Sequence, residues 1–450
     1  MKKNQLYFLL ILISVIAVAA IFYSYKRKES QRENKVYSIQ PRKGISKGDK
    51  EWAAVRKQSN VLLDALKQEP TDVKANLSLA ALFIQEARAS GNHMYYDAAA
   101  MKHINRVLVS DSLNFNALVF KSLIYLSQHH FAEGLQTAEK AKKVNPYNAY
   151  VYGLMVDANV EMGSYDSAVA NADKMVSIRP DLTSYSRISY VREILGDYPG
   201  AIEAMRMAVT SGGPGDENTE WSRVQLAQLY EKTNNFGKAD TLYQSSLNLR
   251  PNYPFAIAGL GRVALAAKDY TKAIAYFERA DSFIVDNAIK EELADAYRLA
   301  GQTKKADKVA ESLIESLAKD ANAGNEDESI GHYGDKELAY AYLKVNKVDK
   351  ALEHALLEYN RRPDNIDVNE TVAWALYKKG DYAKALPYIK TALKTKSQNP
   401  VLLCRAALIY SKAGDQTQAA ALLQNSPFSN SYVGTELQNE MKTIPTGKLM

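Results

Sequence analysis

Histidines, cysteines and glycine-rich loops most often carry chemistry, and in this chain they form no familiar catalytic pattern. The sequence has no G-x-x-x-x-G-K-[ST] loop to hold phosphate and no H-E-x-x-H helix to hold zinc. The glycine-rich stretch 212–215 follows a predicted helix, whereas a dinucleotide-binding loop follows a strand. Because a reaction has to be argued from a site, we predict no catalytic residue, no cofactor and no enzymatic activity.

The six histidines offer one candidate metal cluster. His93, His129 and His130 fall at predicted turns of adjacent helix pairs, where they would approach one another. No carboxylate or cysteine at a suitable spacing completes a four-ligand set, so we interpret them as solvated or capping side chains and predict no metal site. His130 and Glu133 form an H-x-x-E pair, but the next residue is a glycine and not a second histidine. The single cysteine, Cys404, is expected to be a small buried hydrophobic residue.

The net charge of +6 is concentrated at the N-terminus. Residues 1–50 contain eleven Lys or Arg and three acidic residues, a net +8, so the other 400 residues carry −2. A nucleic-acid-binding protein needs positive charge on the folded surface that meets phosphate. The charge distribution therefore argues against a nucleic-acid partner, while an apolar content of 46% predicts a folded chain.

The N-terminal residues 6–25 are almost entirely apolar, and no charged residue lies between Lys3 and Lys26. About 20 apolar residues match the hydrocarbon core of a bilayer, so residues 1–28 are predicted to be a single-pass transmembrane anchor. The alternative is a signal peptide, because residues 17–20 offer an A-x-A-like cleavage site. Basic residues after the segment favour a cytoplasmic array and the export-like start favours the other side, so the side stays open. Residues 29–50 are predicted to be a basic linker.

A small residue recurs through the rest of the chain with a period of about 34 residues. In six of nine units an aromatic residue stands three positions before it. In one unit Ile257, Leu260 and Ala264 lie on one helical stripe, and Tyr270 and Phe277 lie on the next. The pattern predicts pairs of amphipathic helices that approach closely at the small residue. We call this position the small-residue slot, and it is occupied by Gly134, Ala168, Ala201, Ala239, Ala273, Ala306, Ala351, Ala385 and Ala419.

This pattern resembles the tetratricopeptide repeat, in which W-x2-L-G-x2-Y is followed by A-x3-F and then by P within a unit of about 34 residues. The resemblance implies an all-α fold, an α-solenoid of about ten helix hairpins wound into a right-handed superhelix behind the N-terminal transmembrane helix. We assign residues 51–430 to the array and expect loops at insertions near 212–218 and 319–334. Residues 431–450 are expected to form a C-terminal tail or cap.

The segments 185–190, 334–340 and 371–377 resemble recurring signatures of a bacterial family of membrane- or envelope-associated tetratricopeptide proteins. That resemblance spans nearly the whole chain and implies a location at the bacterial cell membrane. The family has no assigned reaction, so the resemblance adds little about function.

In tetratricopeptide proteins the first helix of each hairpin lines a concave groove, through positions −18, −15, −11 and −8 when counted back from the slot. Aromatic and arginine side chains recur at these positions, and such side chains dominate binding hot spots. For each aromatic the alternative is packing against the neighbouring unit, whereas Arg262 and Arg298 have less reason to pack. The candidate ligand-binding residues are Tyr150, Tyr190, Trp221, Phe255, Arg262, Arg298, Tyr333, Lys336, Tyr340, Trp374 and Tyr377.

Together these features predict a membrane-tethered scaffold or adaptor that binds a protein or peptide partner in its groove. The alternative is an envelope assembly or glycan-handling component that binds saccharide through the groove aromatics. The 29 tyrosines permit that alternative without requiring it. The identity of the partner, the oligomeric state and the role of the insertions do not follow from the sequence.

Overall fold

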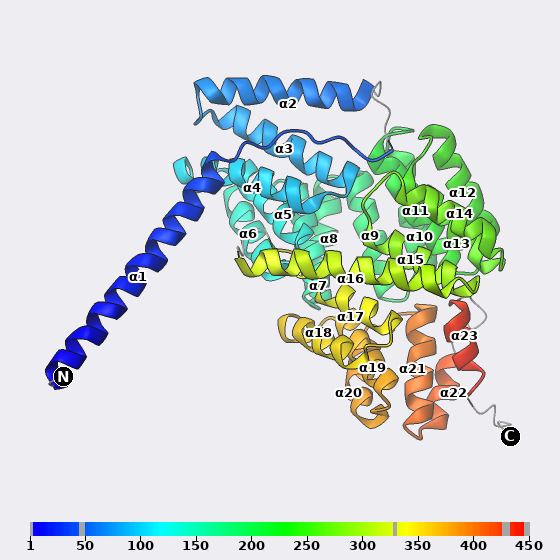
Figure 1. Ribbon diagram of the computed structural model, residues 1–450. Helices are drawn as coiled ribbons and strands as arrows, with labels where there is room; N and C mark the ends of the chain where they lie inside the picture. The colour runs from blue at the N-terminus through cyan, green and yellow to red at the C-terminus, as the bar shows by residue number, and fades with distance from the viewer. Residues whose placement is uncertain (1–2, 45–49, 327–330, 425–432, 445–450) are drawn as a thin grey trace.

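The computed structural model describes residues 3–44, 50–326, 331–424 and 433–444. Over these residues the regular structure consists of helices, labelled α1 to α23 in Figure 1. The predicted linker, second insertion and tail lie partly outside the described residues, at 45–49, 327–330, 431–432 and 445–450. Helix α1 (Lys3–Asn34) stands apart from the rest, and α2 (Lys50–Gln68) lies over α3 (Figure 1).

Ten helix hairpins follow one another within the described residues, which confirms the predicted all-α array. Their first helices are α3 (Val73–Ser90), α5 (Phe115–Ser127), α7 (Ala149–Glu161), α9 (Leu182–Ile194), α11 (Glu217–Lys232), α13 (Pro254–Ala266), α15 (Asn287–Leu299), α17 (Asp335–Lys344), α19 (Ile366–Lys379) and α21 (Pro400–Lys412). Their second helices are α4 (His93–Ser110), α6 (Phe131–Val144), α8 (Tyr165–Ile178), α10 (Tyr198–Ser211), α12 (Phe236–Leu249), α14 (Tyr270–Asp281), α16 (Thr303–Glu326), α18 (Val348–Arg361), α20 (Tyr382–Ala392) and α22 (Gln416–Gln424). A last helix, α23 (Thr435–Met441), packs against α21.

The small-residue slot is a point of close contact between the two helices of a hairpin. All eight slot alanines are fully buried. Gly134 leaves no room for a side chain, because a Cβ there would lie 2.8 Å from the Leu126 side chain. In this hairpin Ser122 Oγ also donates a hydrogen bond to the Gly134 carbonyl at 2.8 Å. Close packing at the slot therefore holds each pair of helices together.

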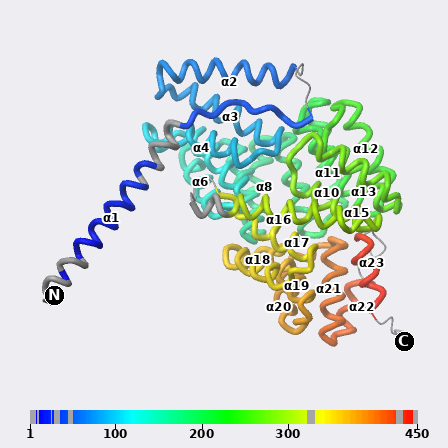
Figure 2. Tube along the Cα trace, viewed as in Figure 1, coloured from blue at the N-terminus to red at the C-terminus, as the bar shows by residue number. Residues whose placement is uncertain are grey.

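The array winds back on itself, so that the turn inside one hairpin contacts the loop between two later hairpins. Figure 2 traces this path, with the chain after α16 returning to the earlier helices. Asn365 Nδ2, for example, donates to the Glu161 carbonyl at 3.0 Å across 204 residues, which is six repeats along the chain. We call these contacts rungs. Among the described residues they join 90–91 to 285 (rung one), 128–130 to 331–333 (rung two), 160–165 to 362–366 (rung three) and 196 to 396–398 (rung four).

The predicted transmembrane anchor is wrong. Within the ranges that the structure describes, no helix is both long enough and apolar enough to cross a membrane. Helix α1 does not end where the apolar run ends; it continues through Lys26, Arg27 and Lys28 to Asn34, so apolar and charged residues share one helix. The predicted location as a single-pass protein of the bacterial cell membrane rested on that segment and is therefore not supported.

Part of the predicted linker lies against the array. Tyr37 and Ile39 are buried in the same core cluster as α3 and α4. Arg42 forms an ion pair with the fully buried Glu86 of α3. Lys43 Nζ donates to a carbonyl at the end of α14 at 3.3 Å. Residues 37–43 therefore connect the first hairpin to the unit that contains α14.

The two insertions differ from each other. Residues 212–216 form a loop that ends where α11 begins. The second insertion is not simply a loop, because it lengthens α16 to 24 residues, compared with 14 for α6. Residues 331–333, near its C-terminal end, lie at rung two. The extra residues thus bring the end of this connection to a turn in the first part of the array.

Candidate functional site

A series of ion pairs and hydrogen bonds connects the first helices of consecutive hairpins. Arg187 of α9 reaches Asp157 of α7 at 2.7 Å, and Lys344 of α17 reaches Asp295 of α15 at 2.6 Å. We call the series the charge ladder, and it joins every pair of consecutive first helices from α7 to α21. We call the surface that these side chains form along the first helices the inner surface. Its other contacts are Glu193–Lys232, Glu231–Arg262, Arg262–Glu292, Tyr340–Glu370 and Glu370–Arg405.

Arg262, a predicted binding residue on α13, is held by side chains of both neighbouring hairpins. Its Nε lies 2.9 Å from Glu231 Oε2, its Nη1 lies 3.2 Å from Glu292 Oε1, and its Nη2 donates to the Tyr243 hydroxyl at 2.9 Å. Burial raises the pKa of Glu292 to about 6, and Arg262 opposes that shift. The guanidinium therefore has a fixed orientation on the inner surface, where we had expected a solvated side chain.

Arg405 lies at the C-terminal end of the ladder. Its Nη1 lies 2.7 Å from Glu370 Oε1 and donates to the Tyr340 hydroxyl at 3.0 Å. Its guanidinium lies over the Trp374 ring at 4.8 Å, and Trp374 stacks on Tyr377 with ring centroids 4.7 Å apart. Both rings are buried. Three predicted residues, Tyr340, Trp374 and Tyr377, thus form one packed group with Arg405.

Four other predicted residues lie on α7 to α13. Tyr190 and Trp221 remain 37% exposed, which leaves part of each ring accessible. The Arg187 guanidinium lies over the Tyr150 ring, and its Cζ is 6.0 Å from the ring centroid. Phe255 packs into the core between neighbouring hairpins. Of these four side chains, Tyr190 and Trp221 are therefore the better placed to contact a partner.

The remaining three predicted residues lie in other surroundings. Arg298 pairs with Asp307 of its own hairpin at 3.0 Å and takes no part in the ladder. Tyr333 lies at rung two, where its ring stacks on that of His130 at 4.0 Å. Although burial alone would lower it, the pKa of Lys336 is raised by the surrounding carboxylates. The structure thus does not bring these three into one site with Arg262.

Sequence reasoning missed several ladder residues by one position. Arg187, Glu292 and Arg405 stand at position −14 relative to the slot, whereas the prediction used positions −18, −15, −11 and −8. Positions −14 and −11 are three apart, so they share one face of a helix. Long charged side chains recurring at position −14 are the signal that would have found them.

Glu291 is an inner-surface carboxylate that takes no part in the ladder. Burial raises its pKa to about 7; Lys344 opposes the shift, while Asp295, Glu337 and Glu292 add to it. The inner surface around α15 is therefore acidic, and a cation placed beside Glu291 would favour its ionised form.

Metal-ligating side chains come together at rung two. In the part of the chain that the structure describes, one group of three stands out, and its possible ligand atoms lie within 4.8 Å of one another: His129, His332 and Glu337. The candidate cluster that the sequence analysis considered, in which His93 and His130 accompany His129, is not this group. His332 and Glu337 lie six repeats after His129, so no local spacing could reveal it.

A family model described as a tetratricopeptide repeat matches residues 224–287, 336–400 and 370–429. The chain carries tetratricopeptide repeats. The matched segments include α13, α14 and α18 to α21, and therefore the ladder residues Arg262, Glu370 and Arg405. Repeats of this kind indicate a protein-interaction scaffold.

Several solved structures are similar to this tetratricopeptide array. A tetratricopeptide repeat protein from Parabacteroides merdae is 14% identical, with a TM-score of 0.43 over 54% of this chain and 92% of that one. The type IV pilus biogenesis factor PilW is 16% identical, with a TM-score of 0.38 over 45% of this chain and 92% of that one. The APC/C hetero-tetramer Cut9–Hcn1 is 14% identical, with a TM-score of 0.40 over 87% of this chain and 73% of that one. No curated protein matches the chain, and these likenesses carry no argument about function.

Proposed function

We propose that the chain is a non-enzymatic scaffold whose inner surface, along α7 to α21, binds a segment of a partner protein. The observation that carries this proposal is the charge ladder, because it ties the first helices into one continuous surface. The ladder also holds long side chains such as Arg262 and Arg405 in fixed positions. Side chains that are already ordered lose less entropy when a partner binds.

The charge of the inner surface favours a partner segment that carries lysine or arginine. The ladder cations are already paired with carboxylates, whereas Glu291 lies outside the ladder with its pKa raised by burial to about 7. A partner's cation beside Glu291 would compensate for that burial. Tyr190 and Trp221, each partly exposed, supply contacts for apolar groups of the same segment. The proposed partner segment is therefore both basic and apolar.

The saccharide alternative has less support from the geometry. Binding a sugar through aromatic side chains requires an accessible ring face. Trp374 and Tyr377 are buried and stack on each other, and Phe255 lies in the core between hairpins. We therefore favour a protein partner.

Site-specific photo-crosslinking of the full chain in cells tests the proposal. A photoreactive phenylalanine analogue would replace Tyr190 or Trp221 on the inner surface. The matched control is Tyr147, an aromatic residue that is 83% exposed on the loop before α7. We expect the same partner to be captured at both inner positions and not at Tyr147. Capture of the same proteins at all three positions, or of none at the inner ones, would contradict the proposal.

A charge-reversal pair tests the chemistry of the partner. Glu291→Lys places a cation among the groups that we propose to attract one, so the yield of the crosslink at Tyr190 should fall about tenfold or more. The control is Glu311→Lys, on an exposed position of the outer helix α16, which should leave the yield unchanged. Equal yields for Glu291→Lys and the unaltered chain would show that the partner is not recognised through its basic residues.

A further inference from the structure

The four rungs bring a hairpin turn against a loop six repeats later, and at three of them the turn residue is a glycine. Gly91, Gly163 and Gly196 have φ angles of 73°, 79° and 83°. A Cβ on these residues would lie 1.9, 2.3 and 2.6 Å from backbone atoms of the opposing loop. Glycine is therefore required twice, by the left-handed backbone and by the close approach of the later loop.

Rung two has a histidine at the equivalent turn position. His129 has a φ of 62°, in the region that side chains other than glycine rarely adopt. Its imidazole lies at the contact between the turn and the later loop, with its ring centroid 4.2 Å from that of His332. Rung two therefore departs from the other three rungs by placing a metal-ligating side chain at the point of closest approach.

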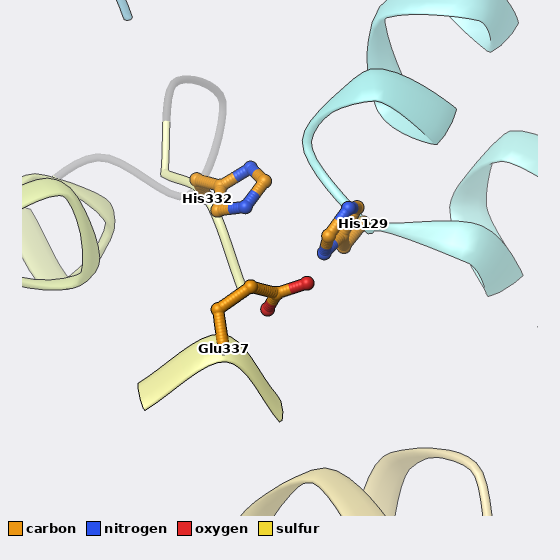
Figure 3. A group of neighbouring side chains, drawn as sticks. All are labelled: His129, His332 and Glu337. Carbon is orange, nitrogen blue, oxygen red and sulfur yellow. The ribbon is translucent and has the colours of Figure 1, made fainter. Parts of the chain in front are cut away.

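The opposing side of rung two departs from the repeat as well. The second insertion lengthens α16, and the C-terminal end of this insertion presents His332 to His129. Glu337, on the first turns of α17, points toward the same place (Figure 3). Two independent irregularities of the array, a histidine in a glycine position and an insertion in a loop, thus meet at one point.

Hydrogen bonding leaves this group ready to accept a cation. His129 Nδ1 lies 3.2 Å from the Tyr333 carbonyl, so Nδ1 carries the proton and Nε2 has a free lone pair. Metal-bound histidines commonly donate their second ring nitrogen to a backbone carbonyl in this way. Glu337 Oε2 is a buried atom with no hydrogen-bond partner among the described residues. An unpaired buried carboxylate oxygen is costly, and a bound cation would remove that cost.

We propose that His129, His332 and Glu337 bind one divalent transition-metal ion, with Zn²⁺ as the best-matched ion. Two imidazole nitrogens and one carboxylate oxygen form a ligand set that Zn²⁺ uses, with a fourth position left for water or another donor. His129 belongs to the first part of the array and the other two residues to a later part. The ion therefore joins two successive turns of the superhelix.

The protonation states suit this role. Burial lowers the pKa of His332 to about 4 and also lowers the pKa of His129, so both imidazoles are neutral at pH 7. Burial opposes ionisation of Glu337, but the neighbouring Lys336 ammonium lowers the pKa of this carboxyl group, which is therefore ionised. A metal ion would displace no proton from these ligands at pH 7.

The distances are compatible with metal binding after small side-chain movements. The ligand atoms lie within 4.8 Å of one another. An ion at bond lengths of about 2.0–2.2 Å requires each ligand atom to move inward by roughly 0.5–1 Å, which side-chain rotation can supply. A backbone rearrangement is not required.

Metal titration of the untagged full-length chain tests the proposal. After removal of metal by a chelator, Zn²⁺ binding is measured by calorimetry and Zn²⁺ content by elemental analysis. We expect one Zn²⁺ per chain, at least about tenfold weaker binding in Glu337→Gln and His129→Gly, and a rise in thermal stability with Zn²⁺ only in the unaltered chain. Co²⁺ substituted for Zn²⁺ should give the visible absorption of a four-coordinate site.

Matched variants separate loss of the ligand from loss of the fold. His129→Gly introduces the residue that occupies the same turn at three other rungs, so it is compatible with folding. Glu291→Gln removes a buried carboxylate outside the group, and His354→Gln removes a histidine that is paired with Asp335. Both controls should bind Zn²⁺ like the unaltered chain. No binding by the unaltered chain, or unchanged binding by Glu337→Gln and His129→Gly, would overturn the assignment.

Discussion

Rungs two and three join the same kinds of element, a hairpin turn and an inter-hairpin loop, but they complete their contacts differently. At rung three Arg362 lies between Glu358 and Glu161, and its side chain is only 4% exposed. At rung two the buried Oε2 of Glu337 has no hydrogen-bond partner among the described residues. A rung whose charges are paired within the chain is a fixed joint. A rung with an unpaired carboxylate oxygen depends on what else binds there.

Removing the cation of rung three should have the largest effect. Arg362→Leu removes the ion pair of Glu161 and leaves the buried Glu358 paired with Arg361, so we expect a loss of about 3–5 kcal/mol in the free energy of unfolding. The control is Arg298→Leu, because the Arg298–Asp307 pair is partly exposed and should contribute less than about 1 kcal/mol. Urea unfolding followed by circular dichroism measures both. Equal losses in the two variants would show that rung three is not a fixed joint.

A side chain at a glycine rung should have the next largest effect. In Gly91→Ala the new Cβ meets the Val285 carbonyl, and the left-handed backbone adds strain. We therefore expect the free energy of unfolding to fall by about 2–4 kcal/mol. Gly380→Ala isolates the strain, because Gly380 also has a positive φ but has nothing within 4 Å of its Cβ position. Hydrogen exchange of the Val285 amide, which donates to the Ser90 carbonyl, reports the rung directly. Unchanged protection of that amide in Gly91→Ala would contradict a tight rung one.

The pH dependence of metal-free rung two should show an effect of intermediate size. His332 faces His129, Glu337, His93 and Asp97, and burial lowers its pKa from 6.5 to about 4. Below pH 6.5 the unfolded chain binds a proton that the folded chain excludes, so stability falls as the pH drops from 6.5 toward 4. Because the side chain is partly exposed, we expect His332→Asn to remove about 1–2 kcal/mol of that loss. Urea unfolding curves of the unaltered chain and of His332→Asn at pH 7 and pH 4.5, with chelator present, measure this difference. An equal fall in the free energy of unfolding in both chains would contradict the prediction.

Replacing the turn residue of rung two should have the smallest effect on the metal-free chain. His129→Gly relieves a left-handed backbone that costs a residue other than glycine roughly 1–2 kcal/mol, but it makes the unfolded chain more flexible, which offsets about 0.4–1 kcal/mol of that gain. It also removes the hydrogen bond to the Tyr333 carbonyl, which costs about 0.5–1.5 kcal/mol. We therefore expect a stability within about 1 kcal/mol of the unaltered chain in chelator. A much larger loss would mean that the imidazole supports the rung without any metal.

The hairpins were predictable because their determinants are local. The slot residue and its small counterpart on the first helix are 12 residues apart, as with Gly134 and Ser122. The rungs were not predictable, because they join residues that lie 194 to 205 positions apart in the sequence. The repeat period states which helices pair but not how tightly the superhelix winds. The metal-binding group at rung two escaped detection for the same reason.

The inner surface was only partly predictable. The sequence placed Arg262 on the correct helix face but gave no reason for its side chain to be held. Its partners, Glu231 and Glu292, lie 31 and 30 residues away on the neighbouring first helices. Opposite charges about one repeat apart on the same face would have predicted the ladder. The N-terminal segment failed for another reason, since the length of an apolar run does not show where its helix ends.

The rungs also have a consequence for how the chain folds. In an ordinary solenoid each repeat contacts only its neighbours, so folding spreads locally from any point. Here the turn after α7 is completed only when the loop before α19 arrives, 201 to 205 residues later. Closing so long a loop is entropically costly, and contacts distant in sequence form slowly. We therefore expect the hairpins to assemble first into an open array, and its closure into touching turns to be the slow, cooperative last step of folding.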